Sequence, residues 1–91
     1  MPLRYANEVR RPAPHVVFKR VGDELVLLDY DRGVYYGLDA AGARMWELLA
    51  AELDEAAIVA QLLTEFEVDE ETLRRDMEAL NVELLRLKLL L

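Results

Sequence analysis

The sequence predicts an α+β fold in which a three-stranded antiparallel sheet is followed by three α-helices. Three observations support this βββααα order. β-Branched and aromatic runs separated by turn residues extend to about residue 39. Apolar residues then recur with a helical period to the end of the chain. The chain has 91 residues, 54% of them hydrophobic, which suits a single packed core.

The strands are predicted over residues 15–21, 24–30 and 34–39. Gly22-Asp23 separates the first two, and Asp31-Arg32-Gly33 separates the second from the third. Gly33 can adopt the positive φ that tight turns require. Such short connections predict an antiparallel meander, so the third strand should lie at an edge of the sheet.

Each predicted helix follows an aspartate that can cap its first turn, at Asp39, Asp54 and Asp69. The helical stretches are 40–53, 55–66 and the segment that follows Asp69. The last one carries an apolar stripe of Leu73, Met77, Leu80 and Leu84. Its leucine-rich end, 84–91, is more apolar than one helix face requires. We expect part of this end to pack on the domain or on a second subunit.

The N-terminal segment differs from the rest of the chain. Pro2, Pro12 and Pro14 predict an irregular arm over residues 1–14, followed by a single domain over 15–91. The arm has no apolar stretch typical of a signal peptide, and no apolar run reaches the length of a membrane span. We therefore expect a cytoplasmic protein without membrane contact. Within the domain, we expect Trp46 to anchor the core and Arg44 to pair with a nearby acid.

The residues that usually carry out catalysis are scarce. His15 is the only histidine, and the chain has neither cysteine nor serine. Thr64 and Thr72 lie in helical stretches without a partnered base. We expect no catalytic residue, no metal site and no cofactor, and hence no enzyme. The net charge of −7 would repel nucleic acids on average.

Binding remains as a possible function, and the third strand is the best candidate surface. Alternation places Val34, Tyr36 and Leu38 on one face and Tyr35 and Gly37 on the other. We expect the Leu38 face to meet the core. An open edge can accept a further strand from a partner, but tyrosines are also ordinary strand residues that pack on neighbours. The residues alone leave these alternatives open, as well as which tyrosine would face a groove.

The run "DELVLLDYDRGVYYGLDAAGARMWELL", residues 23–49, resembles the PqqD family. The matching features are the step Leu38-Asp39, the run Gly42-Ala43-Arg44-Met45-Trp46, and Val68-Asp69 before the last helix. The resemblance covers about residues 15–90, and it rests on the order and spacing of several short motifs.

The resemblance implies a RiPP recognition element, a domain that binds the leader segment of a ribosomally made precursor peptide. It also implies a fold similar to a winged helix-turn-helix. The leader would add as a strand to the third strand and lie against the third helix. Residues implied on the strand side are Val34, Tyr35, Tyr36 and Gly37. Those implied on the helix side are Leu73, Arg74, Met77, Glu78 and Asn81. Val26 and Leu28 would contribute to the groove floor.

The resemblance also implies the kind of pathway. We favour lasso-peptide biosynthesis, in which the domain works with a leader peptidase and a cyclase that resembles asparagine synthetase. The alternative is a peptide chaperone in pyrroloquinoline quinone biosynthesis, which delivers its precursor to a radical enzyme. A winged-helix DNA-binding protein is a further alternative, although the last helix begins with acids. Without ligand, the open edge could also pair with a second copy to form a homodimer.

Overall fold

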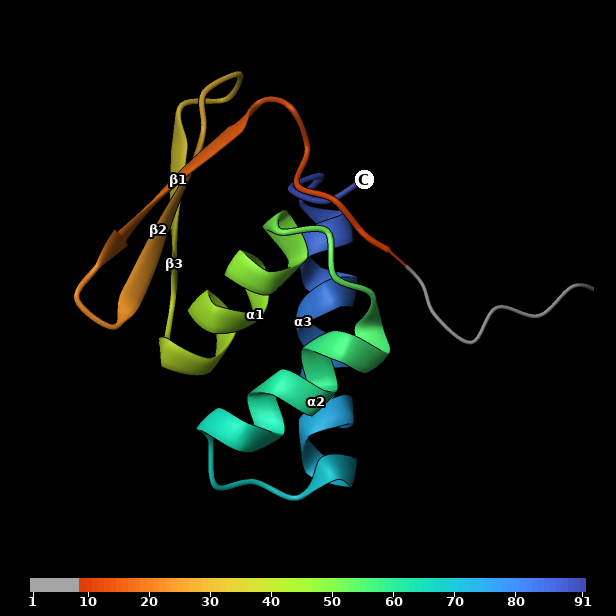
Figure 1. The fold of residues 1–91 in the computed structure, drawn as a ribbon. Coiled ribbons are helices and arrows are strands. Elements are labelled where there is room, and N and C mark those ends of the chain that lie inside the picture. Colours follow the sequence, from red (N-terminus) through yellow and green to blue (C-terminus); the bar gives the residue numbers. More distant parts are fainter. Residues whose placement is uncertain (1–8) are drawn as a thin grey trace, which may run out of the picture.

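The computed structural model describes residues 9–91 and confirms the predicted order of three strands and three helices (Figure 1). The strands are β1 (Val16–Val21), β2 (Glu24–Asp29) and β3 (Val34–Leu38), and the helices are α1 (Ala40–Ala50), α2 (Glu55–Glu65) and α3 (Glu70–Arg86). Each predicted strand is one residue longer than these bounds.

The sheet is an antiparallel meander in the order β1-β2-β3, so β3 lies at an edge, as predicted. Both connections turn at glycines with positive φ, 67° at Gly22 and 68° at Gly33. In the register, Leu27 lies opposite Phe18 on one side and Tyr36 on the other. The register therefore determines which side chains share a face.

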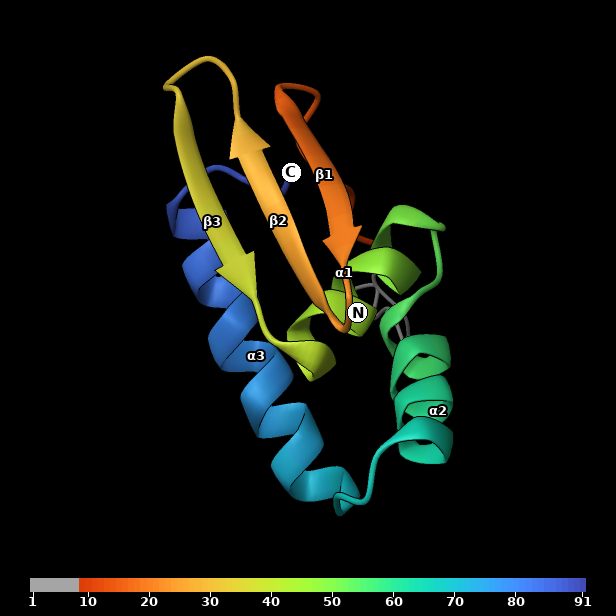
Figure 2. The same ribbon diagram turned by 90° about the vertical axis from the view of Figure 1, so that its left-hand side faces the viewer.

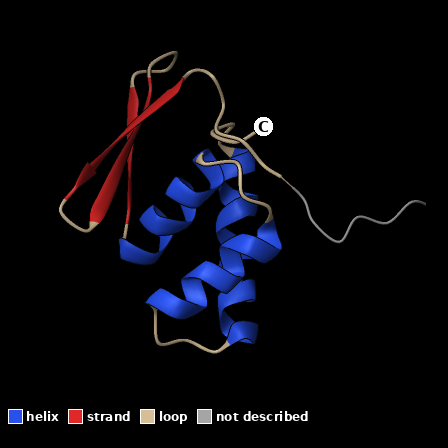
Figure 3. Cartoon of the chain, in the orientation of Figure 1, coloured by secondary structure: helices blue, strands red, loops and turns tan. Residues whose placement is uncertain are grey.

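All three helices lie on the same side of the sheet, as Figures 1 and 3 show. Helix α1 contacts β2, β3 and both other helices. In the view of Figure 2, the three strands lie in front and no helix covers them. We call the covered side of the sheet the inner face and the uncovered side the outer face.

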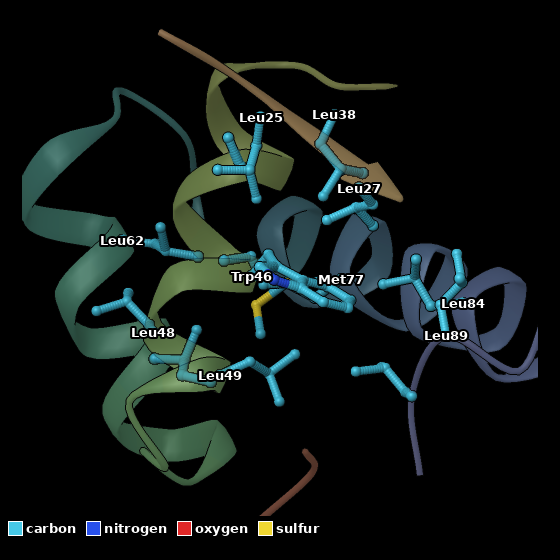
Figure 4. Close-up of a cluster of buried hydrophobic side chains, with 14 of the residues drawn as sticks. Leu25, Leu27, Leu38, Trp46, Leu48, Leu49, Leu62, Met77, Leu84 and Leu89 are labelled. Carbon is cyan, nitrogen blue, oxygen red and sulfur yellow. The ribbon is translucent and has the colours of Figure 1, made fainter. Parts of the chain in front are cut away.

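Trp46 of α1 lies at the centre of the core and is fully buried (Figure 4). Leucines from the inner face, including Leu25 and Leu27, surround it together with Met77 of α3. The ring of Phe18 meets the indole edge-to-face, with centroids 5.8 Å apart. The predicted role of Trp46 as a core anchor is confirmed.

The three aspartates cap the helices as predicted. The carboxylate of Asp39 accepts a hydrogen bond from the Gly42 N–H at 3.0 Å. Asp54 accepts from the Ala57 N–H at 2.9 Å, and Asp69 from the Thr72 N–H at 2.8 Å. Each bond satisfies a donor that the first helical turn leaves free.

The C-terminal residues pack on their own domain. Helix α3 ends near Lys88, whose φ is 61°, and Leu89 and Leu90 beyond it are buried. The N–H of Ala13 donates to the Leu89 carbonyl, and Pro12 forms an isolated antiparallel bridge with Leu90. We call this pairing the terminal clasp. Residues 1–8 of the predicted arm, including Pro2, lie outside the described residues, and the boundary of the arm at residue 14 stays a prediction.

Candidate functional site

The two tyrosines of β3 point to opposite faces of the sheet. Tyr36 lies on the inner face with the buried Leu38, and it is partly buried. All three helices, α3 among them, lie on this side of the sheet (Figure 1). Tyr35 lies on the outer face with 69% of its surface exposed. The inner-face residue Tyr36 is therefore the one that faces the side of α3.

A hollow of about 680 Å³ opens where β3 ends, and we call it the strand-end hollow. Its walls come from the end of β3, the first turn of α1, the end of α2 and the middle of α3. The apolar side chains that line it are Leu38, Met45, Leu62, Phe66, Val68, Leu73, Met77 and Leu80. Its volume and apolar lining are typical of sites that hold a bulky group of a ligand.

The rim of the strand-end hollow is acidic, with Asp39, Glu67 and Asp76 among its lining residues. Asp39 is occupied as the cap of α1. Glu67 and Asp76 have no ion pair within the described residues. By contrast, Glu65 forms an ion pair with Arg44 at 2.8 Å. The pairing predicted for Arg44 is thereby confirmed, and the hollow keeps two unneutralised carboxylates at its mouth.

Val26 and Leu28 do not lie where we expected them. Val26 is opposite Gly37, and Leu28 is opposite Tyr35, so both point to the outer face. The strand-end hollow and α3 are on the inner face. These two residues, which we expected in the groove floor, therefore point away from the strand-end hollow, because neighbouring residues of a strand alternate between faces.

On α3, three of the expected groove residues face away from β3. Arg74 pairs with Glu55 of α2 at 3.7 Å and with Glu70 at 3.0 Å. Asn81 lines a small cavity with Arg10 and residues of α1 and α2. Glu78 is exposed and does not line the strand-end hollow. These three side chains, which we expected on the helix side of the groove, do not line the strand-end hollow, because a helix turns about 100° per residue and they lie on the α2 side.

The residues of α3 that do reach the hollow are Leu73 and Met77, as expected, and also Asp76, Ala79 and Leu80. Leu80 approaches the first turn of α1, because a Cβ built on Gly42 would lie 3.4 Å from its Cδ2. Asp76, Ala79 and Leu80 share one side of the helix by the i, i+3, i+4 spacing. The sequence shows this spacing, but it does not show whether this side of α3 faces the hollow or the solvent.

The described residues do not assemble reactive chemistry. Within residues 9–91, no three histidine or acidic side chains come together as metal ligands. The single histidine, His15, has its Nε2 3.7 Å from a carboxylate oxygen of the buried Asp29. None of the helices in this part of the chain is long and apolar enough to span a bilayer. The site is thus an apolar hollow beside an open strand edge.

An open edge strand beside an apolar hollow, on a winged helix-turn-helix-like fold, is the architecture of a peptide-binding domain. Residues 24–90 match the family described as Coenzyme PQQ synthesis protein D (PqqD). The chain belongs to the PqqD family and is a RiPP recognition element, a class of peptide-binding domain that is not itself an enzyme.

Two solved structures resemble the chain closely. One is described as TbiB1 in complex with the TbiA(beta) leader peptide; it has a TM-score of 0.83 and 36% identity over 88% of this chain and 93% of that one. The other is described as lasso peptide synthetase B1 complexed with the leader peptide; it has a TM-score of 0.83 and 26% identity over 92% of this chain and 99% of that one. Among curated proteins, none has a sequence that matches the chain.

Proposed function

We propose that this domain binds the leader segment of a ribosomally synthesised precursor as a fourth strand along β3. The observation that carries the proposal is the free edge of β3 beside the strand-end hollow. Backbone groups of an edge strand give affinity to an added strand, and adjacent pockets give specificity. Both solved structures described above are complexes with leader peptides, which supports a leader peptide as the ligand here.

The hollow indicates what kind of leader would fit. A strand added to β3 would direct every second side chain to the inner face, toward α3 and the hollow. The apolar lining favours a bulky apolar side chain at that point. The free carboxylates of Glu67 and Asp76 favour a lysine or arginine next to it. In this proposal Val34, Tyr35, Tyr36 and Gly37 supply the strand edge.

We place the domain in lasso-peptide biosynthesis, where it would present the precursor to a leader peptidase and an asparagine-synthetase-like cyclase. The similarity to lasso peptide synthetase B1 supports this choice. The description of the matched family favours a second candidate, a chaperone that hands its precursor to a radical enzyme in quinone-cofactor synthesis. In both cases we propose a cytoplasmic location, where precursor peptides are made.

The test is a titration of the domain with a synthetic leader peptide of the precursor encoded beside it. Isothermal titration calorimetry should show one peptide per domain. Ala79→Tyr should fill the hollow and weaken binding at least about tenfold, since the exposed helix position tolerates the ring. Glu78→Tyr places the same ring one residue away, outside the hollow, and should keep the affinity.

Two outcomes would count against the proposal. The first is the absence of any binding at micromolar peptide. The second is equal weakening by both tyrosine variants, because that result would mean that the hollow is not the contact. Offering a lasso-type leader and a quinone-type precursor to the same sample separates the two pathways by which of them binds.

A further inference from the structure

The outer face of the sheet is apolar although no helix covers it (Figure 2). Its side chains form cross-strand rows, Val17–Leu28–Tyr35 and Lys19–Val26–Gly37, followed by Val21. Val17 is 49% exposed and Val21 57%. A sheet with one solvated face normally carries polar residues there, and contiguous exposed apolar patches mark interaction sites.

The outer face is also hollowed. A shallow depression of about 340 Å³ is lined by residues of all three strands, among them Val17, Lys19, Val26 and Tyr35. Gly37 ends the row Lys19–Val26–Gly37 and has no side chain. A Cβ built on it would meet nothing within 4 Å, and its φ is not in the left-handed region. The fold itself therefore does not require glycine at position 37. Close approach of another molecule to the strand would require it.

One charge lies within this apolar surface, the ammonium of Lys19. It has no ion pair within the described residues, and it belongs to a chain of net charge −7. A partner that covers the outer face would have to neutralise this ammonium, because an unpaired charge is costly to bury. The partner surface should therefore be apolar with a carboxylate near Lys19.

The outer face is continuous with the proposed leader site, because β3 belongs to both. Half of the side chains of a leader strand on β3 would emerge on the outer face beside Tyr35 and Gly37. A protein seated on this face would touch the domain and the bound leader together. It would therefore distinguish the loaded domain from the empty one.

We propose that the outer face is the docking surface for the leader peptidase that cleaves the leader-bound precursor. The inference rests on the proposed function. A second copy of this chain is a poorer occupant, since it would bring two Lys19 ammonium groups into one apolar interface. The only carboxylate from the same face of β1 and β2 is that of Glu24, at the end of the strand.

The experiment compares Lys19→Glu and Val17→Asp with Arg75→Glu, a charge reversal on α3 that is remote from the sheet. Each variant is assayed twice: for the affinity of the synthetic leader, and for the rate at which purified leader peptidase cleaves the precursor. Strand β1 is two strands away from the leader edge. We therefore expect all three variants to keep leader affinity within about twofold.

Cleavage should slow at least about tenfold with Lys19→Glu and with Val17→Asp, because a charge clash or a buried carboxylate opposes docking. With Arg75→Glu, the peptidase should cleave the precursor at the wild-type rate. If the peptidase cleaves the precursor at the wild-type rate with both β1 variants, the outer face is not the docking surface. The proposed leader site would be unaffected by that result. A wild-type dimer in light scattering that Lys19→Glu dissolves would overturn it in favour of a second copy. Failure of the wild type to bind leader would remove the proposed function itself.

Discussion

Trp46 is fully buried and lies among leucines of the sheet and Met77 of α3 (Figure 4). Its Nε1–H is buried without a hydrogen-bond partner. We predict that Trp46→Ala lowers the free energy of unfolding by about 3–5 kcal/mol, because it leaves a large cavity. Urea unfolding followed by circular dichroism measures the change. Trp46→Phe is the control and should cost less, since it keeps a ring and removes the unpaired donor.

Glu47 links β1 to α1 through an ion pair. Its carboxylate accepts hydrogen bonds from the Arg20 guanidinium, with the Arg20 Nε at 2.8 Å, and lies 3.5 Å from Arg44. The bond from Arg20, helped by the charge of Arg44, lowers the pKa of Glu47 below the usual 4.5. The folded state thus holds the proton less tightly than the unfolded state does. Its contribution to stability is present above the unfolded pKa and is lost as the pH falls through the folded pKa.

We therefore predict that the melting temperature of Glu47→Gln lies below that of the wild type at neutral pH. The difference should begin to narrow as the pH falls below about 4.5 and should close once the pH is below the lowered pKa of the folded state, where the wild-type carboxylate is also neutral. Thermal melts between pH 7 and pH 3 measure both curves. A difference that stays constant across this range would mean that the charge of Glu47 is not what stabilises the contact.

At the scale of elements, the two glycines of the β2–β3 hairpin have opposite roles. Gly33 has a φ of 68°, a region in which an L-residue with a Cβ is strained, so Gly33→Ala should cost about 1–2 kcal/mol. Gly37 is in ordinary strand geometry with open space around it, so Gly37→Ala should stabilise the fold by about 0.5–1 kcal/mol. Urea midpoints measure both, and shifts of the same sign would contradict this account.

The elements themselves could be predicted because their signals are local. Asp39, Asp54 and Asp69 each bond to an N–H three residues later, and the turn at Gly33 needs only its own φ. The sequence could also have predicted that Val26 and Leu28 point to the outer face. The hairpin register pairs Val26 with Gly37, which alternates with the buried Leu38.

The walls of the hollow could not be predicted in the same way. Leu73 and Met77 were identified through their apolar stripe, but Asp76 and Ala79 depend on how α3 crosses α1 and α2. Phe66 and Val68 line the hollow from the connection between α2 and α3, together with Leu38 of β3. These are tertiary arrangements between segments far apart in the chain, which the period of a single helix does not determine.

At the scale of the whole molecule, the two edge strands, β1 and β3, should respond differently when leader binds. Hydrogen exchange of backbone amides on the free side of β3 should slow when leader binds, while β1, the opposite edge, should not change. Peptide at about one hundred times its Kd should stabilise the domain by about 2.7 kcal/mol, which a melting curve detects. Protection of β1 in place of β3 would show that the strand adds at the other edge.

The terminal clasp has a consequence for the way the chain acquires its structure. Ala13 and Leu89 are joined by a hydrogen bond although 76 positions of the sequence separate their numbers, and both side chains are buried. Contacts between such distant segments can form only late, when both are present. On the ribosome, the sheet and the first two helices would therefore emerge before the segment that completes their core. Until Leu89 and Leu90 leave the exit tunnel, the nascent domain has to persist with part of its apolar interior open to solvent.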